Sequence, residues 1–179
     1  MAAQQETGGS DIMSLVERTI QRNLKGLELL GAPEPSVGLT PKDQLYRRGT
    51  FILDHYRPLA DELYRVPVLM VMATTNRSYI FDLAPGHSMI EFLLKRGFDV
   101  YVLHWGIPRN DESGLRLDDY VEDFIPEAIR RVQAHSGVDD VSLLGYCMGG
   151  VLSTIYAALN PKGPLKNLAC FTTPSISPR

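Results

Sequence analysis

A glycine-rich segment near the end of the sequence contains the residue best suited to chemistry. It runs from Gly145 to Gly150 as GYCMGG, between an apolar run at 141–144 and a small-residue helical pattern at 149–159. A nucleophile flanked by glycines between a strand and a helix is typical of a nucleophile elbow. The turn is so tight that flanking side chains would collide with the neighbouring strand and helix, and glycine avoids the collision. The segment therefore predicts such an elbow, with Cys147 as its nucleophile.

The neighbours of Cys147 fit this prediction. The thiol would lie at the positive end of the following helix, where the dipole and the free N–H groups favour a thiolate over a thiol. The N–H of Met148 would point toward a developing oxyanion, while Gly145 and Gly149 permit the turn. A free cysteine is more often a small buried apolar side chain, and we expect that core role for Cys170. At Cys147 the strand, the helix and the glycine spacing together favour the nucleophile.

A second oxyanion donor is expected from the loop that follows the predicted strand at 66–73. The candidates are the backbone N–H groups of Thr74, Thr75 and Asn76. Residue type does not identify a backbone donor, so this loop is equally well interpreted as a plain connection.

A cysteine elbow also needs a general base and an orienting carboxylate, which follow the nucleophile in the order Asp, then His. Residues 148–179 contain no Asp, no Glu and no His, and all histidines of the sequence precede Cys147. Of these, His104 follows a predicted strand at its carboxyl end and is the one expected near the site. A substrate-side or packing role is favoured for it over that of general base. The triad is incomplete within this sequence.

Composition excludes several classes of protein. The 179 residues include 18 Lys and Arg against 21 Asp and Glu, a net charge of −3, which disfavours electrostatic nucleic-acid binding. No apolar run approaches the roughly 20 residues of a membrane span, and no secretory signal is present, so we expect a cytoplasmic protein without a transmembrane segment. We find no phosphate loop, metal-ligand cluster or dinucleotide fingerprint, and we expect no cofactor.

Two domains are predicted. Residues 1–39 comprise an amphipathic helix at 11–30 and a linker rich in proline and glycine at 31–39. The apolar stripe of this helix is expected to rest on the domain, with a partner chain or a lipid-like surface as the alternatives. The second domain, 40–179, is predicted to open with a short helix at Thr40-Pro41-Lys42-Asp43, read as an N-cap, a first-turn proline and an early acid.

Strands and helices then alternate along the second domain. Strands are predicted at 51–56, 66–73, 98–103, 141–144 and 168–171, and helices at 88–96, 118–135 and 149–159. Pro126 predicts a kink or restart of the second of these helices. Four apolar strands joined by helical crossovers indicate an α/β fold with a parallel sheet and helices on both faces. In such sheets the chemistry gathers at the carboxyl ends of the strands.

Several stretches of the sequence resemble the polyhydroxyalkanoate synthases over residues 40–174. The matching stretches are TPKD at 40–43, NRSYIFDL at 76–83, GFDVYVLHWGIP at 97–108, LDDY at 117–120 and GYCMGG at 145–150. Together they are far more specific than the elbow alone. At position 104, where the family often has Asp or Ser before the tryptophan, this chain has His104.

The resemblance implies an α/β-hydrolase fold and an acyltransferase that polymerises 3-hydroxyacyl-CoA through a cysteine thioester at Cys147, with release of CoA. It also implies a growing polyester chain as a partner, with a dimer or a second synthase subunit and a granule surface as further partners. The family's Asp and His lie well beyond the elbow. We therefore expect an amino-terminal fragment, truncated after the elbow and one further strand, which is inactive or nearly so alone.

Two other interpretations are kept open. Dienelactone hydrolases also have a cysteine at the elbow, so a cysteine hydrolase of small esters or lactones is one alternative. The other is a non-catalytic half-domain that binds a complementary chain or polymer granules.

Overall fold

The computed structural model describes residues 7–30, 36–107 and 109–174. The chain divides into two units between residues 35 and 36, and each is described by itself. The first unit contains helix α1 (Thr7–Leu30), which confirms the predicted amphipathic helix and begins four residues before it. Part of the predicted linker, residues 31–35, lies outside the described residues. In the described ranges no helix is both long and apolar enough to cross a bilayer.

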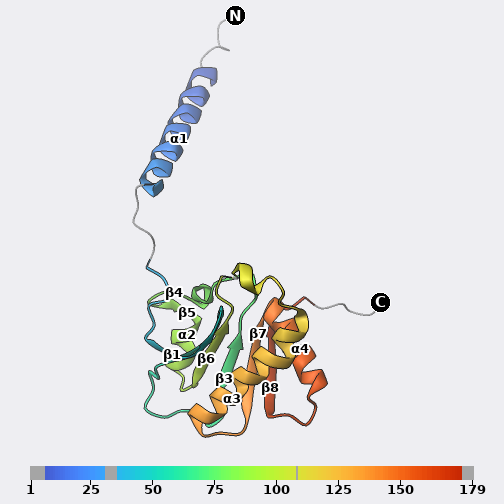
Figure 1. The fold of residues 1–179 in the computed structure, drawn as a ribbon. Helices are drawn as coiled ribbons and strands as arrows, with labels where there is room; N and C mark the ends of the chain where they lie inside the picture. The colour runs from blue at the N-terminus through green and yellow to red at the C-terminus, as the bar shows by residue number, and fades with distance from the viewer. Residues whose placement is uncertain (1–6, 31–35, 108, 175–179) are drawn as a thin grey trace, which may run out of the picture. The chain divides into compact units, whose positions relative to one another are not determined.

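The second unit is built on a six-stranded sheet in the order β1-β2-β6-β3-β7-β8 (Figure 1). Its strands are β1 (Lys42–Arg48), β2 (Phe51–Tyr56), β3 (Val68–Val71), β6 (Val100–His104), β7 (Val141–Tyr146) and β8 (Leu165–Phe171). The last four in sheet order run parallel to one another, as predicted, whereas β1 and β2 are antiparallel to their neighbours. The parallel strands bring their carboxyl ends to one edge of the sheet.

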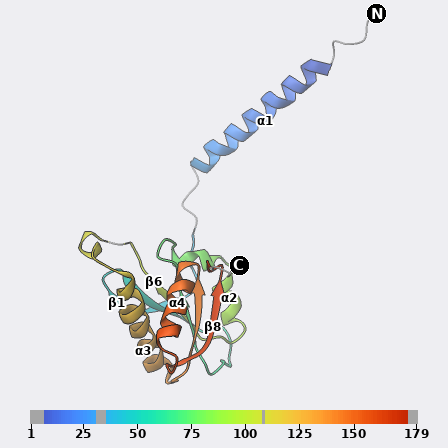
Figure 2. The ribbon, with the colours of Figure 1, turned by 90° about the vertical axis from the view of Figure 1, so that its right-hand side faces the viewer.

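Helices cover both faces of this sheet. Helix α2 (Met89–Leu94) connects β3 to β6, and α3 (Ile125–Ser136) connects β6 to β7. Helix α4 (Met148–Leu159) follows β7 directly. Viewed from the side, α3 and α4 lie on one face and α2 lies on the other (Figure 2). This is the two-sided α/β arrangement that the alternating pattern predicts.

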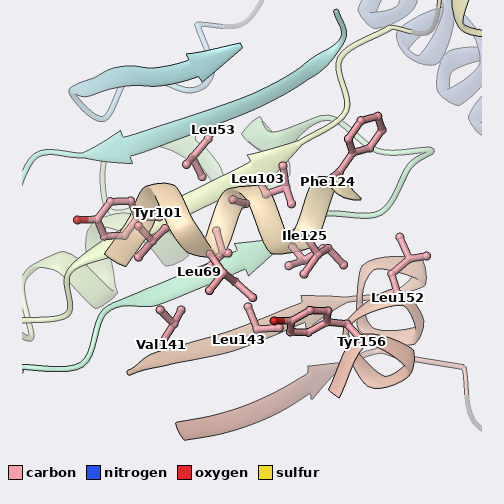
Figure 3. Packing of buried hydrophobic residues seen from close by; sticks show 14 of the residues in the cluster. Leu53, Leu69, Tyr101, Leu103, Phe124, Ile125, Val141, Leu143, Leu152 and Tyr156 are labelled. Carbon is pink, nitrogen blue, oxygen red and sulfur yellow. The ribbon is translucent and has the colours of Figure 1, made fainter. Parts of the chain in front are cut away.

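Two separate hydrophobic clusters hold these layers together. Because strand side chains alternate between faces, the odd-numbered apolar residues of β2, β3, β6 and β7 pack against α3 and α4 (Figure 3). The even-numbered residues, among them Met70 and Val102, pack with Ile90 and Leu94 of α2. All four residues of β3 are buried, as expected for a central parallel strand covered on both faces.

Local sequence signals set the helix boundaries. The Ser88 hydroxyl accepts a hydrogen bond from the Glu91 backbone N–H at 3.0 Å and begins α2. Pro126 lies in the first turn of α3, directly after a π-helical segment, η3 (Asp119–Phe124), which confirms the predicted restart. Gly137 ends α3 with a φ of 71°.

The helix predicted at Thr40-Pro41-Lys42-Asp43 is wrong. Residues from Lys42 onward form strand β1, which pairs antiparallel with β2. Thr40 does not cap a helix, because its hydroxyl donates to Asp82 Oδ1 at 2.6 Å and its N–H to Asp82 Oδ2 at 3.0 Å. The buried Asp82 carboxylate therefore fixes Thr40 in an extended approach to the sheet.

The loop predicted at 74–85 contains short elements of its own. These are a 3₁₀ turn, η1 (Ser78–Phe81), and β4 (Asp82–Ala84), which pairs with β5 (His87–Ser88) in a small separate sheet. Both follow the carboxyl end of β3, so they lie at the edge of the main sheet where chemistry is expected.

Strand β8 is less buried than predicted. It stands last in the sheet order and all but its first residue are exposed, so it forms an open edge of the sheet. The core role predicted for Cys170 is therefore wrong. Its side chain is exposed, and its Sγ lies 3.6 Å from the Thr154 hydroxyl of α4.

Candidate active site

Cys147 occupies the predicted turn between a strand and a helix. It is the single residue between β7 and α4, and its backbone has φ 51° and ψ −119°. Only Cys147 and Thr172 have a positive φ among the described non-glycine residues. Such a conformation costs about 1–3 kcal/mol and persists only where the surroundings enforce it. The chain thus holds a thiol-bearing side chain in a strained turn at the carboxyl edge of the sheet.

The glycines around Cys147 are required by close approaches. A Cβ on Gly145 would lie 2.4 Å from the Cα of Gly150, and a Cβ on Gly149 would lie 2.1 Å from the carbonyl oxygen of Val71. Real Cβ atoms do not approach backbone this closely. The first turn of α4 therefore packs directly on the carboxyl end of β3.

Strand β8 fixes the turn from the other side. The Cys147 N–H donates to the Phe171 carbonyl oxygen at 2.9 Å, and the Cys147 carbonyl oxygen accepts from the Gly150 N–H at 3.0 Å. Thr173 Oγ1 lies only 1.8 Å from where a Gly150 Cβ would be, and this buried hydroxyl has no hydrogen-bond partner among the described residues. The turn at Cys147 is thus held between β3 and the end of β8.

The start of α4 and the loop after β3 contain the N–H groups predicted as oxyanion donors. Met148 is the first residue of α4, so its N–H has no acceptor within the helix. Strand β3 is the parallel neighbour of β7, with Val71 opposite Gly145, so the loop after β3 lies beside the elbow. The Trp105 indole N–H holds the start of this loop by donating to the Met72 carbonyl oxygen at 2.8 Å.

The structure distinguishes among the three candidate donors in this loop. The Asn76 N–H points back to the Ala73 carbonyl oxygen at 3.4 Å, closing a turn. For Thr74 and Thr75, the described part of the chain supplies no acceptor to the N–H groups. The geometry therefore favours Thr74 and Thr75 over Asn76 as the second donor.

His104 lies at the carboxyl end of β6, but its hydrogen bond is to β2, on the side of β6 away from the elbow. Its Nε2 is 3.2 Å from Asp54 Oδ2 on β2, whereas β3 and β7 lie on the opposite side of β6. Lys42 Nζ lies 3.2 Å from the same carboxylate oxygen. Burial would raise the pKa of Asp54, but the hydrogen bond from His104 and the charge of Lys42 outweigh it and hold that pKa below its usual value. This geometry suits the packing role predicted for His104.

Two further histidines belong to a polar cluster at the start of β6, the end of the sheet opposite the elbow. His55 Nε2 lies 2.7 Å from Asp99 Oδ1, and the Tyr101 hydroxyl lies 3.0 Å from Asp99 Oδ2 and 2.8 Å from His135 Nδ1. Burial and the neighbouring Asp99 carboxylate raise the pKa of Tyr101. No local sequence pattern predicts this cluster, because its members come from β2, from β6 and the residue before it, and from α3.

The fourth histidine, His87, is exposed on β5. Within the described ranges no histidine is hydrogen-bonded to Cys147, and no group of three or more potential metal ligands forms. The structure therefore places the Cys147 thiol beside the start of α4, and none of the described histidines is hydrogen-bonded to it.

Comparisons with known proteins identify the fold and the family. Residues 66–178 match the family described as "alpha/beta hydrolase fold", and residues 34–93 match "Poly-beta-hydroxybutyrate polymerase (PhaC) N-terminus". Curated relatives include the poly(3-hydroxyalkanoate) polymerase subunit PhaC of Haloferax mediterranei, 46% identical over 72% of this chain and 26% of the relative. The subunit of the same name from Allochromatium vinosum is 39% identical over 84% of this chain and 43% of the relative.

Solved structures show the same fold at low sequence identity. The Francisella virulence factor BioJ has a TM-score of 0.55 and 16% identity, and the match covers 86% of this chain and 49% of BioJ. A sugar hydrolase from Lactococcus lactis has a TM-score of 0.53 and 14% identity, over 74% of this chain and 53% of the hydrolase. The chain spans between about a quarter and two fifths of the length of the curated relatives that it matches.

Proposed function

The chain belongs to the α/β-hydrolase fold family and within it is a relative of the poly(3-hydroxyalkanoate) polymerases, and we propose that it provides the nucleophile-bearing part of such a polymerase. The observation that carries the proposal is the strained turn at Cys147, with a positive φ and an adjoining helix N-terminus. A thiol in this place suits acyl transfer from a thioester.

The proposed step is a thioester exchange. The Cys147 sulfur attacks the carbonyl carbon of a 3-hydroxyacyl-CoA, a new S–C bond forms, and the bond from that carbon to the CoA sulfur breaks. CoA leaves as the thiol, carrying the proton that Cys147 has lost. Because one thioester replaces another, the acyl group keeps its reactivity toward the hydroxyl of a growing polyester chain. The charge that develops on the carbonyl oxygen would be stabilised by the N–H groups of Met148 and Thr75.

In the part of the chain that the structure describes, no histidine is hydrogen-bonded to Cys147 to take up its proton. The four histidines of the chain are placed elsewhere, and residues 148–179 contain no Asp, Glu or His. We expect this chain alone to form an acyl-enzyme slowly and not to polymerise. The base and its carboxylate would then come from residues outside this sequence. Acylation without a base draws only on oxyanion stabilisation and binding, which give about 10³- to 10⁴-fold over water in comparable enzymes.

The test is acylation of the purified chain by 3-hydroxybutyryl-CoA, followed by intact-mass measurement and peptide mapping. We expect a hydroxylamine-sensitive adduct on Cys147, with no more than one CoA released per chain. Cys147→Ser should abolish the adduct, whereas the matched variant Cys170→Ser should retain it. An adduct on both cysteines alike would contradict the proposal. Rapid turnover of simple esters without CoA-thioester acylation would favour a dienelactone-type hydrolase instead.

A further inference from the structure

Met72, the first residue beyond β3, is held at both of its backbone groups. Its N–H donates to the Leu103 carbonyl oxygen at 3.1 Å, and its carbonyl oxygen accepts from the Trp105 indole N–H at 2.8 Å. The same carbonyl oxygen lies 2.6 Å from where a Cβ on Gly149 would be, so the first turn of α4 lies against it. Met72 and Ala73 are both fully buried. The chain therefore leaves β3 in a fixed direction.

The restraint ends one residue further on. Thr74 is half-buried and Thr75 is exposed, and the described part of the chain supplies no acceptor to their N–H groups. These are the N–H groups predicted as the second oxyanion donor. Their direction follows from the backbone before them, where the hydrogen bonds of Met72 are the nearest restraint.

The Trp105 ring is itself fixed by other aromatic rings. It is 4% exposed, and its centroid lies 4.9 Å from that of Tyr120, edge to face, and 6.0 Å from that of Phe124. Both rings come from the π-helical segment η3, a rare conformation that is frequent at functional sites. A ring packed in this way directs its N–H to one acceptor, the Met72 carbonyl oxygen.

We propose that Trp105 is a positioning residue for acyl transfer at Cys147, a reaction that rests on the proposed function. Its indole N–H fixes Met72 so that the N–H of Thr74 or Thr75 faces the carbonyl oxygen that becomes charged when the thiol attacks. Such donors stabilise a transition state most when they are oriented before the reaction begins. Trp105 acts through the loop and not on the acyl group itself.

The test compares two reactions of the same thiolate. With phenyl thioacetate, the Cys147 sulfur bonds to the carbonyl carbon, the bond from that carbon to the thiophenol sulfur breaks, and thiophenolate leaves. Charge develops on the carbonyl oxygen in this reaction. With iodoacetamide, the sulfur bonds to the methylene carbon and iodide leaves, so no oxyanion forms.

Peptide mapping of the full chain gives both rates at Cys147 and at the exposed Cys170. The ratio of acylation to alkylation at Cys147, divided by the same ratio at Cys170, is called the acylation preference below. It measures oxyanion stabilisation, because the fraction of thiolate affects both reactions of one cysteine alike.

Two variants remove the indole N–H. Trp105 is the only tryptophan of the sequence, so incorporation of 3-benzothienylalanine in place of tryptophan changes this side chain alone, replacing its N–H with sulfur at nearly constant shape. Trp105→Phe removes the N–H together with part of the ring. We expect the acylation preference to fall by about 10- to 100-fold in both, somewhat less than the loss of an entire oxyanion donor.

Tyr101→Phe is the matched control. Tyr101 is a buried aromatic residue of β6, the strand that Trp105 follows, and its hydroxyl is hydrogen-bonded to Asp99 and His135 at the opposite end of the sheet. The control therefore removes the hydrogen bonds of one aromatic side chain and keeps its ring. Its acylation preference should equal that of the unaltered chain. Thermal unfolding verifies that each variant is folded.

An unchanged acylation preference in the 3-benzothienylalanine chain would overturn the proposal. An equal fall in Tyr101→Phe would overturn it as well, because general loosening of the core would then explain the effect. So would an unaltered chain in which Cys147 has no preference over Cys170.

The series contains no CoA thioester, so its result is separate from that of the proposed function. A chain whose acylation preference depends on Trp105 but that resists 3-hydroxybutyryl-CoA would retain the role of Trp105 and lose only the proposed function. Acylation by 3-hydroxybutyryl-CoA with a preference independent of Trp105 would have the reverse meaning.

Discussion

Cys147 holds a backbone conformation that a glycine would adopt without strain. Its φ of 51° and ψ of −119° lie outside the regions open to residues with a side chain. Packing of α4 on β3 and the hydrogen bond to Phe171 impose this conformation. The strain lies in the backbone of Cys147, and its cost in free energy is offset by the surrounding contacts.

Cys147→Gly should therefore raise the free energy of unfolding, by about 1 kcal/mol after the greater chain entropy of glycine is subtracted. Cys170→Gly is the matched change in a strand without positive φ, and it should lower the free energy of unfolding by about 0.5–1 kcal/mol. Urea unfolding of both variants measures the difference. Equal destabilisation by the two glycines would show that the turn at Cys147 is unstrained.

Asp54 is a buried carboxylate that two side chains from other strands contact. Its side chain is 7% exposed and lies 3.2 Å from both Lys42 Nζ and His104 Nε2. Removing one partner of a buried ionic group leaves the other charges without compensation.

Asp54→Asn should lower the free energy of unfolding by roughly 3 kcal/mol at neutral pH. Since the pKa of Asp54 is held below its ordinary value, this stabilisation is complete above the unfolded-state pKa and is lost as pH falls through the folded one. The difference between Asp54→Asn and the unaltered chain should therefore shrink below about pH 4. Asp123→Asn, which removes an exposed pair with Arg48, should change the free energy by at most about 1 kcal/mol. A difference for Asp54→Asn that is independent of pH would exclude the charge as its cause.

Among the elements, the sequence predicts best where the local pattern and the tertiary contacts agree. The run from Val68 to Val71 is apolar on both faces and becomes the buried β3. Pro126 and Gly137 place the start and the end of α3 because they restrict or permit specific backbone angles.

The prediction fails where a distant group competes with a local signal. Thr40 has the composition of an N-cap, yet its hydroxyl binds Asp82, which is 42 residues away. Strand β1 has only exposed and half-buried residues because it lies at the outside of the sheet, and its pairing with β2 is not visible locally. The partner of His104 was missed for the same reason, since Asp54 is 50 residues away.

Helix α4 can pack on β3 because Gly149 has no side chain. Gly149→Ala would place a Cβ 2.1 Å from the Val71 carbonyl oxygen and 2.6 Å from that of Met72. Backbone atoms cannot yield as a flexible side chain can, so we expect a loss of about 3 kcal/mol in the free energy of unfolding. Gly114→Ala is the control, because nothing lies within 4 Å of its Cβ position. Chemical denaturation compares the two, and equal effects would mean that α4 does not pack on β3 as described.

At the scale of the whole molecule, stability resides in the second unit. Both hydrophobic clusters consist of residues between Leu45 and Leu165 and include no described residue of α1. Helices of this unit cover each face of the sheet, so we expect the unit to fold without residues before 36.

Removal of residues 1–35 should accordingly leave the thermal unfolding midpoint of the remainder within about 2 °C of that of the full chain. A change of 1 kcal/mol in the free energy of unfolding shifts the midpoint of a domain of this size by about 2–4 °C, so a shift below 2 °C means a smaller change in stability. Helix α1, at 24 residues, should be only partly helical as an isolated peptide, since short helices without packing are marginal in water. Circular dichroism of the full chain, the shortened chain and the peptide measures both effects. A midpoint lowered by 5 °C or more would indicate that the apolar stripe of α1 rests on the domain, which is the first interpretation from the sequence. An unchanged midpoint would favour the alternatives, in which the stripe contacts a partner chain or a lipid-like surface.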